Sequence, residues 1–406
     1  MALCRQLTLS HHFCIMAGVS YFGEGEEVNE GVQQILFCPN LKIAEAYFDF
    51  AAYTKTFPNN INNKLHYILH HPIRAARLGL SHQDTFKKDY GKYIASIAER
   101  YNVDAIICVQ DPIWAVQQVM AAVQKNLNRI FAVYQVDPWG LFDNDNVNGQ
   151  IREQRDELAA LQQSTLWFTT PVLYDLYAKH PMYQPFLTKM TSMEFPNLVY
   201  RNVQEDSVFV FDRNYVNLLF CGSIQGDYRD PGFLLKLLEL SAKSGIKLRC
   251  YFLGDILKEF FLPYAEKLRG MLFFHSAVAP ERGYATMQQA DCLVNIGNSY
   301  TNMVPSKIID YFAMCKPILN IQKIYRCPSE RYFNLYPLVQ TVKEFEPLDK
   351  QVPQAINFLQ QCKSMYIKYE TVERLFINST PQKAASILEN KLLQHYNSAN
   401  IKRDKK

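Results

Sequence analysis

Short apolar runs alternate with longer amphipathic segments along the whole chain. In the first half, the apolar runs lie at 64–71, 104–110, 129–136 and 165–170, and helical patterns lie at 85–101 and 113–127. In the second half, the apolar runs lie at 216–223, 246–254, 271–278, 291–297 and 317–322, with helical patterns at 231–244, 256–269, 281–290, 306–314, 351–364 and 382–396. Apolar strands between amphipathic helices are typical of parallel sheets covered on both faces. We therefore predict a doubly wound α/β architecture that occurs twice.

The length of 406 residues allows two or three domains at about 150 residues each. We place the break near 195–198, because the segment 200–214 that follows has no clear period. An N-terminal Rossmann-like domain would then span 1–198 and a second one 199–380, and 381–406 would form a C-terminal helix with a basic tail. Two such domains facing one another form an inter-domain cleft, and open α/β sheets bind ligands at the carboxyl ends of their strands.

Composition narrows the classes of partner. Hydrophobic residues make up 48% of the chain and aromatic residues 13%, so it can fill two cores and is not a disordered chain. The net charge of +4 is too small to indicate nucleic-acid binding, and we expect none. The half from 201 to 406 carries the excess of lysine and arginine. That excess fits a phosphate-bearing ligand, or it is a solvated surface.

The cysteines and histidines give no sign of a disulfide framework or a metal centre. The ten cysteines are scattered and include no Cys-x-x-Cys pair, which is typical of reduced thiols in a cytoplasmic protein. The pairs His11-His12 and His70-His71 have no partners at zinc-like spacing, so we expect no metal site. The first twenty residues make a poor signal peptide, and no apolar run reaches the ~18–20 residues of a membrane span.

A glycine-bearing loop follows the predicted strand at 216–223. Gly222 and Ser223 end this strand, and Gly226 follows in the stretch FCGSIQGDYRD. Glycines let backbone N–H groups approach a phosphate closely, particularly where a helix begins after the loop. The alternative interpretation is an ordinary strand-to-helix turn.

The stretch TNMVPSKIID (301–310) places a lysine at the start of a predicted helix. Pro305 suits the first positions of a helix, and Ser306 and Lys307 follow it. The dipole at a helix start is already positive, so a lysine there indicates that an anion binds. Asp310 lies one turn further on, where a carboxylate can accept the hydroxyls of a ribose. The alternative is a surface helix with an internal Lys–Asp pair worth ~0.2–0.5 kcal/mol.

The longer stretch NIGNSYTNMVPSKIIDYFAMCKPIL (295–319) resembles the donor-site signature of retaining GT-B glycosyltransferases, particularly glycosyltransferase family 4 and family 1-like relatives. The resemblance extends to RGYATMQQADCLVNI (282–296) and covers most of 216–322. It implies transfer of a sugar from a nucleoside-diphosphate sugar to a glycan or lipid-linked acceptor, in surface polysaccharide or glycolipid biosynthesis. It also implies a retaining, metal-independent reaction with no cofactor besides the donor, and a last helix that packs back on the N-terminal domain.

The resemblance also implies roles for particular residues of the second half. Lys307, Ser306 and the loop with Gly222 and Ser223 would bind the diphosphate, helped by Arg229 or Arg282. Asp310 stands where the family has the second glutamate of its signature and would hold the ribose. Asn302 stands where the family has the first glutamate, so a sugar-binding amide replaces a negative charge there.

In the first half, many relatives carry a His-Glu-Pro step that faces the reacting sugar. This chain has Gln110, Asp111 and Pro112 at that place. Gln110 cannot act as a base, so Asp111 and Asp137 are the catalytic candidates. Each also stands before a proline and suits a helix N-cap or a turn. The donor phosphate can itself take the acceptor proton while the site stabilises charge on the leaving diphosphate.

Three questions stay open from the sequence. The stretch 64–92 gathers basic residues, histidines and aromatics, which fits peripheral contact with the inner face of a membrane or a solvated surface. The departures at Asn302 and Gln110 suit a non-catalytic glycosyltransferase-like protein that binds nucleotide or scaffolds a partner. A nucleotide-sugar 2-epimerase has the same two-domain plan and ranks below both.

Overall fold

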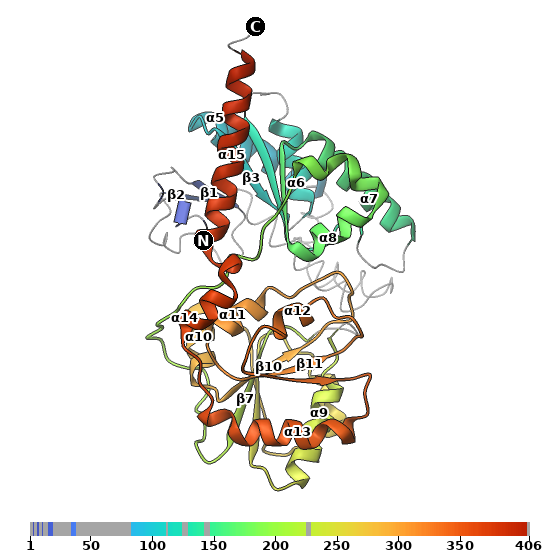
Figure 1. Cartoon of the computed structure of the whole chain (residues 1–406), viewed down its shortest axis with the longest axis vertical. Coiled ribbons are helices and arrows are strands. Elements are labelled where there is room, and N and C mark those ends of the chain that lie inside the picture. Colours follow the sequence, from blue (N-terminus) through green and yellow to red (C-terminus); the bar gives the residue numbers. More distant parts are fainter. Residues whose placement is uncertain are drawn as a thin grey trace, which may run out of the picture. The chain divides into compact units, whose positions relative to one another are not determined.

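The computed structural model describes residues 3, 6–7, 10, 15–18, 34–37, 83–110, 113–123, 129–141, 147–224 and 229–403. The chain divides into two compact units, and in Figure 1 the red last helix belongs to the same unit as the blue and green elements. Unit 1 comprises Met1–Glu194 and Ala384–Lys406, and unit 2 comprises Phe195–Lys383. Each unit has a parallel sheet with helices, which confirms the predicted α/β class.

The larger sheet of unit 1 has four parallel strands in the order β3-β4-β5-β6. The strands are β3 (Ala105–Val109), β4 (Ile130–Gln135), β5 (Leu166–Thr169) and β6 (Met190–Ser192). The helices between them are α5 (Gln83–Arg100), α6 (Ile113–Val123), α7 (Val147–Gln163), α8 (Pro171–Lys179) and the 3₁₀ helix η1 (Pro181–Lys189). A second, two-stranded parallel sheet joins β1 (Ile15–Gly18) and β2 (Gln34–Phe37).

Side chains of the unit 1 sheet alternate between its faces, as the strand period of two requires. Val133 of β4 and Trp167 of β5 lie in a buried cluster with residues of α6, α7 and α8. Their neighbours Tyr134 and Phe168 lie in a second cluster together with Leu388 of the last helix, α15 (Pro381–Arg403). The last helix therefore packs on the face of the unit 1 sheet opposite to α6, α7 and α8 (Figure 1).

Unit 2 has six parallel strands in the order β12-β11-β10-β7-β8-β9. They are β7 (Val216–Cys221), β8 (Leu248–Leu253), β9 (Leu272–His275), β10 (Cys292–Ile296), β11 (Ile318–Gln322) and β12 (Val339–Lys343). Numbered along the chain from β7, this is the order 3-2-1-4-5-6 of the Rossmann fold. The strand order reverses between β7 and β10, and ligands of such sheets bind outside the carboxyl ends of the strands at that point.

Helices cover both faces of the unit 2 sheet (Figure 1). Leu218 and Phe220 of β7 share a buried cluster with α9 (Gly232–Lys243) and α13 (Leu348–Gln361). On the opposite face, Tyr311 of α11 (Lys307–Ala313) reaches the backbone of Cys221. The remaining helical segments are η3 (Lys258–Tyr264), α10 (Pro280–Gln289), α12 (Glu330–Phe333), η4 (Cys362–Ser364), α14 (Tyr369–Leu375) and η5 (Ile377–Ser379).

Several local predictions need correction or fall outside the described residues. The helix predicted at 256–269 is the short 3₁₀ helix η3 followed by turns, because Pro263 lacks the N–H that an α-helix interior needs. Helix α7 and strand β12 were not predicted. The strand predicted at 64–71 and most of the stretch 64–92 lie outside the described residues, except for the beginning of α5.

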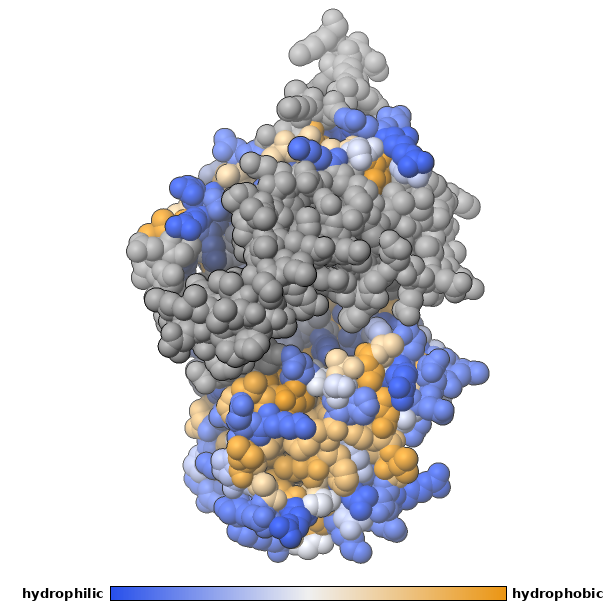
Figure 2. All heavy atoms as spheres, turned by 180° about the vertical axis from the view of Figure 1, so that it is seen from behind, coloured by the Kyte–Doolittle hydropathy of each residue, from blue (hydrophilic) through white to orange (hydrophobic). Residues whose placement is uncertain are grey.

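The surface of unit 2 carries an apolar area. Figure 2 shows apolar residues in the middle of the drawn face of this unit and polar residues around them. The area alone identifies no partner, since apolar atoms contribute much of any protein surface. None of the helices in the described part has the length and hydropathy of a membrane span. The cysteines in this part are all free thiols: Cys108, Cys221, Cys250, Cys292, Cys315, Cys327 and Cys362.

Candidate functional site

Two loops meet at the carboxyl edge of the unit 2 sheet, where β7 and β8 end. The N–H of Gly222 donates to the carbonyl oxygen of Leu253 at 2.9 Å. Gly254 has a φ of +139°, and a Cβ on it would lie 1.9 Å from the carbonyl oxygen of Gly222. Only glycine fits this position, so the loop after β8 supports the loop that carries Gly222.

Predicted phosphate-binding residues lie together at the end of β7. Nη1 of Arg229 donates to the carbonyl oxygen of Ser223 at 3.1 Å, and the same guanidinium borders Gly222. The hydroxyl of Tyr311 donates to the carbonyl oxygen of Cys221 at 3.0 Å and accepts from the backbone N–H of Cys221 at 2.9 Å. Helix α11 is therefore fixed against the end of β7. Gly226 lies outside the described residues.

The start of α11 carries the predicted serine and lysine. The side chain of Ser306 makes no capping hydrogen bond, so its hydroxyl is not used by the helix itself. Lys307 is exposed. Burial raises the pKa of the Cys221 thiol to about 12, and the charge of Lys307 acts against this. The same charge favours the ionised form of Asp310, so the ammonium group acts on the end of β7 and on the predicted ribose-binding carboxylate.

Asp310 is largely withdrawn from water, with its side chain 14% exposed. The hydroxyl of Tyr284 on α10 donates to Oδ1 at 3.2 Å, and Nη2 of Arg201 lies 4.0 Å from the same oxygen. Burial raises the pKa of Asp310 to about 6, although Arg201, Tyr284 and Lys307 all favour the carboxylate. Among the described residues, none donates a hydrogen bond to Oδ2. This oxygen is the one that a ligand can engage.

The other residues predicted for unit 2 lie in two different settings. Asn302 is buried in the loop after β10. Arg282 is exposed on α10, two residues from Tyr284. Residues two apart on a helix do not share a face, so Arg282 projects away from the contact between Tyr284 and Asp310. The structure thus brings Gly222, Ser223 and Arg229 together, and leaves Arg282 on a different face of its helix from Tyr284.

The catalytic candidates of unit 1 follow β3 and β4. Asp137 is half-buried in the loop after β4, and Nε2 of Gln135 donates to its backbone oxygen at 3.1 Å. Asp111 lies outside the described residues. Gln110 is buried at the end of β3, and its N–H donates to the carbonyl oxygen of Tyr134 at 3.0 Å. Gln110 and Asp137 therefore lie at the carboxyl edge of neighbouring strands.

A buried carboxylate that the sequence did not indicate supports the loop of Asp137. Glu157 of α7 is fully buried, and each of its oxygens accepts two hydrogen bonds. Oε1 accepts from Gln135 at 2.9 Å and from Tyr177 at 2.5 Å. Oε2 accepts from the N–H of Gly140 at 3.2 Å and from Tyr183 at 2.5 Å. Gln135 and Gly140 lie on either side of Asp137, so this network fixes both ends of its loop.

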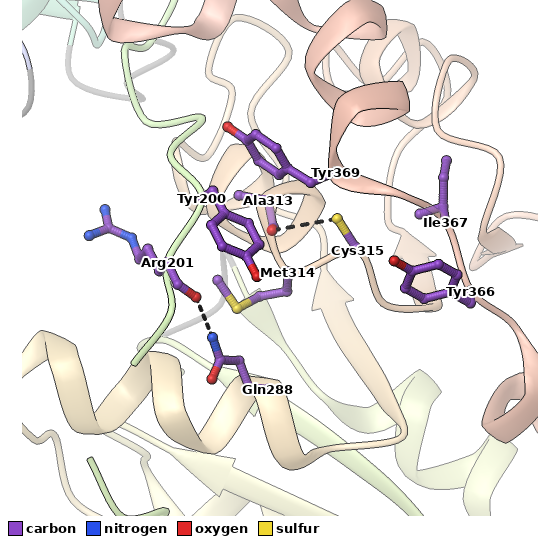
Figure 3. A pocket seen from close by; sticks show the side chains of 9 residues that line it. All are labelled: Tyr200, Arg201, Gln288, Ala313, Met314, Cys315, Tyr366, Ile367 and Tyr369. Carbon is purple, nitrogen blue, oxygen red and sulfur yellow. Dashed lines mark hydrogen bonds between the residues drawn. The ribbon is translucent and has the colours of Figure 1, made fainter. Parts of the chain in front are cut away.

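Unit 2 also contains a pocket of about 210 Å³ (Figure 3). Its lining comes from the segment before β7, the end of α10, the end of α11, the segment before α14 and the first residue of α14: Tyr200, Arg201, Gln288, Ala313, Met314, Cys315, Tyr366, Ile367 and Tyr369. Figure 3 shows that the guanidinium of Arg201 points away from this pocket while its backbone borders it. No group of three or more His, Cys, Asp and Glu side chains converges in the described part of the chain.

The sequence did not predict four residues that support the candidate site residues or the strands and loops around them: Arg201, Tyr284, Tyr311 and Glu157. Tyr284 and Tyr311 lie inside stretches that carry the family resemblance, but only the three-dimensional packing shows which groups they contact. Arg201 lies in the aperiodic segment after the predicted break. No local pattern could have found it.

Two α/β units with parallel sheets, one in the Rossmann strand order, define the GT-B architecture, and solved structures agree. The apo structure of OtsA superposes with a TM-score of 0.60 at 11% identity, covering 97% of this chain and 96% of its own. A glycosyltransferase from Rickettsia africae ESF-5 gives 0.58 at 13% identity over 97% of this chain and 93% of its own. A Listeria monocytogenes protein assigned as a UDP-N-acetylglucosamine 2-epimerase gives 0.52 at 9% identity over 78% and 80%. No family model and no curated protein matches the sequence.

Proposed function

We propose that the chain is a glycosyltransferase that takes a sugar from a nucleoside-diphosphate sugar held by unit 2. The observation that carries this proposal is the position of Gly222, Lys307 and Asp310. All three follow β7 or β10, the strands between which the Rossmann order reverses, and ligands of such sheets bind at that point. The GT-B fold and its glycosyltransferase neighbours support this class of reaction.

In this proposal, different residues of unit 2 bind the diphosphate, the ribose and the sugar of the donor. Lys307 and Arg229 supply positive charge for the diphosphate, and glycine at position 222 lets the diphosphate approach the backbone of this loop closely. Oδ2 of Asp310 accepts a ribose hydroxyl, and Asn302 contacts the sugar. These cationic groups neutralise the leaving diphosphate, so the proposed reaction is metal-independent and uses no cofactor besides the donor.

The acceptor belongs to unit 1 in this proposal. Asp137 at the end of β4 is the catalytic candidate within the described residues, and Asp111 remains a candidate from the sequence alone. The family resemblance supports a retaining reaction of the family 4 type, a glycan or lipid-linked acceptor, and a role in surface polysaccharide or glycolipid synthesis on the cytoplasmic side of a membrane. Contact of 64–92 with that membrane is part of the same proposal.

Calorimetric titration with UDP, GDP and dTDP tests the donor site directly. We expect one of these nucleotides to bind, and Lys307→Ala to weaken it by about 1.5–3 kcal/mol, the usual size of a charge-assisted hydrogen bond. Lys258→Ala is the matched control, because Lys258 begins η3 and is exposed in the same unit. An unchanged dissociation constant in the Lys307 variant would remove the lysine from the site.

Hydrolysis of the matching sugar donor separates the remaining functions. Turnover of the donor, alone or with an acceptor, supports the transferase. Binding without any turnover favours a non-catalytic nucleotide-binding or scaffold protein, which the buried amides Asn302 and Gln110 would suit. Interconversion of the donor sugar without transfer favours the 2-epimerase, whose fold is similar.

A further inference from the structure

Arg201 is held at both its backbone and its side chain by one face of α10. The guanidinium carbon lies 3.9 Å from the ring centroid of Tyr284, and Nε2 of Gln288 donates to the backbone oxygen of Arg201. Tyr284 and Gln288 are four residues apart, so they lie one turn apart on the same helix face. Figure 3 shows the backbone contact at the edge of the pocket and the guanidinium extending away from it.

The segment that carries Arg201 is attached to α14 as well. The hydroxyl of Tyr369 donates to the carbonyl oxygen of Leu198 at 3.3 Å, and the rings of Tyr200 and Tyr369 meet edge to face at 5.2 Å. These contacts, together with those to α10, fix a segment that has no helix or strand of its own. Fixing an arginine in this way lowers the entropy that it loses when it meets a partner.

The partner of the arginine is Asp310. Nη2 of Arg201 and the hydroxyl of Tyr284 both approach Oδ1 of this carboxylate. Tyr284 touches both of the other groups, because its ring stacks on the arginine and its hydroxyl binds the aspartate. With Oδ1 occupied, the plane of the carboxylate is fixed and Oδ2 is the oxygen left for a ligand.

We propose that Arg201 is a positioning residue of the donor site: supported by Tyr284 and Gln288, it keeps Asp310 ionised and orients Oδ2 toward the ligand. This inference rests on the proposed nucleotide site of unit 2 and deepens it. The charged and titratable groups that act on Asp310 are Arg201 from the segment before β7, Tyr284 from α10, and Lys307 and Tyr311 from α11. Arg201 has the largest favourable effect on the carboxylate among them.

The pH dependence of nucleotide binding tests this role, because a purely structural arginine would not change it. In the wild type, the pKa of Asp310 is about 6, so affinity for UDP or GDP should fall as the pH drops through that value. Arg201→Gln removes a positive charge that favours the carboxylate. The midpoint of the fall should then move upward by about one pH unit. Affinity lost at neutral pH should return at pH 8.5.

Matched variants isolate the charge from the shape of the side chain. Arg201→Lys keeps the charge but loses the flat guanidinium that stacks on Tyr284, so its midpoint should lie between those of the wild type and Arg201→Gln. Arg269→Gln removes an exposed arginine of unit 2 that pairs with exposed Glu266, and should change nothing. Inorganic pyrophosphate has no ribose, so its affinity should be the same in wild type and Arg201→Gln.

The outcomes distinguish this role from the proposed function. Equal loss of UDP and pyrophosphate affinity at every pH would make Arg201 a direct diphosphate ligand and overturn the positioning role. A wild type that binds neither UDP nor GDP would overturn the proposed function instead. The positioning role then still has a direct test in the carboxyl ¹³C titration of Asp310, assigned with Asp310→Asn. An unchanged titration midpoint in Arg201→Gln would overturn it.

Discussion

Glu157 in unit 1 and Asp310 in unit 2 are both carboxylates on helices that pack against a parallel sheet. Glu157 is fully buried and its two oxygens accept four hydrogen bonds, but no cation contacts it among the described residues. Asp310 is partly exposed to solvent. Its Oδ1 accepts one hydrogen bond, from Tyr284, and lies near the guanidinium of Arg201. Burial raises the pKa of both groups.

The difference lies in how completely the protein satisfies each group. A carboxylate has about four acceptor positions, and the neighbours of Glu157 fill them all. Such a network leaves no place for a ligand and acts on the fold, here by fixing the loop around Asp137. Asp310 has a desolvated charge with one oxygen still available. A group kept in that state costs stability and is a candidate for binding.

The largest expected effect on stability comes from removing the carboxylate of Glu157, whose acceptor positions are all filled. Glu157→Ala leaves four donors without their acceptor, and each orphaned donor costs ~1–3 kcal/mol before water enters. We expect the free energy of unfolding of unit 1 to fall by about 3–5 kcal/mol. Urea unfolding followed by tryptophan fluorescence measures it, because Trp114, Trp139 and Trp167 all belong to unit 1.

The control for this prediction is Glu153→Ala. Glu153 lies one turn earlier on α7 and is only partly buried. Its loss should change the unfolding free energy by less than about 1 kcal/mol. If the two variants were equally stable, the network around Glu157 would contribute nothing specific, and the contrast with Asp310 would fail.

Asp310→Asn is expected to raise the stability of the fold, whereas Glu157→Ala lowers it. The carboxyl has a pKa of about 6 in the folded chain against 3.8 for the unperturbed group, so at pH 7 folding keeps a charge where burial disfavours it. Stability from this group therefore rises as the pH falls through 6 toward 4. The amide removes the charge and can still accept from Tyr284. We expect a gain of about 1–3 kcal/mol at pH 7.

Calorimetric unfolding at two pH values tests whether Asp310→Asn stabilises the fold. The gain from Asp310→Asn should be present at pH 7 and nearly absent at pH 4, where the wild-type carboxyl is mostly protonated in the folded chain. Nucleotide affinity should fall in the same variant if the proposed site is right. A variant less stable than the wild type at pH 7 would mean that Arg201 and Tyr284 more than offset the burial of the charge.

The sequence alone was a good guide to the sheets and a poor guide to these two carboxylates. Runs such as 129–136 and 216–223 predict buried strands because a strand covered on both faces is apolar at every position. The spacing of Lys307 and Asp310 likewise places both on one helix. Helix α7 was missed, since its sequence VNGQIREQRDELAALQQ is mostly polar, and Glu157 within it looks like an ordinary solvated charge.

What makes Glu157 and Asp310 different from surface carboxylates comes from residues distant in the chain. Tyr177 and Tyr183 reach Glu157 from α8 and η1, and Tyr284 and Arg201 reach Asp310 from α10 and the segment before β7. Periodicity reports which face of an element is buried, but not which side chains from other elements meet there. The contacts of both groups therefore depend on tertiary packing that no local pattern encodes.

Removing one tyrosine hydroxyl that donates to each carboxylate gives the smallest expected change in stability and the most direct comparison of Glu157 with Asp310. Tyr183→Phe keeps the ring contact with Tyr177, 4.6 Å between centroids, but leaves Oε2 of buried Glu157 with one donor fewer. We expect a loss of about 1–2 kcal/mol in the urea unfolding of unit 1. Tyr284→Phe keeps its stacking on Arg201 and removes the donor from Asp310, whose charge already disfavours folding.

The expected loss for Tyr284→Phe is therefore below about 1 kcal/mol by calorimetry at pH 7. Water can also reach the partly exposed Asp310 and replace the missing donor, whereas no water has access to Glu157. Lowering the pH to 4 should reduce the Tyr284→Phe loss further, because a protonated Asp310 accepts a weaker hydrogen bond. Equal losses of stability for Tyr183→Phe and Tyr284→Phe at pH 7 would contradict this comparison. The oxygen of Asp310 that accepts no hydrogen bond would then make no difference to the stability of the fold.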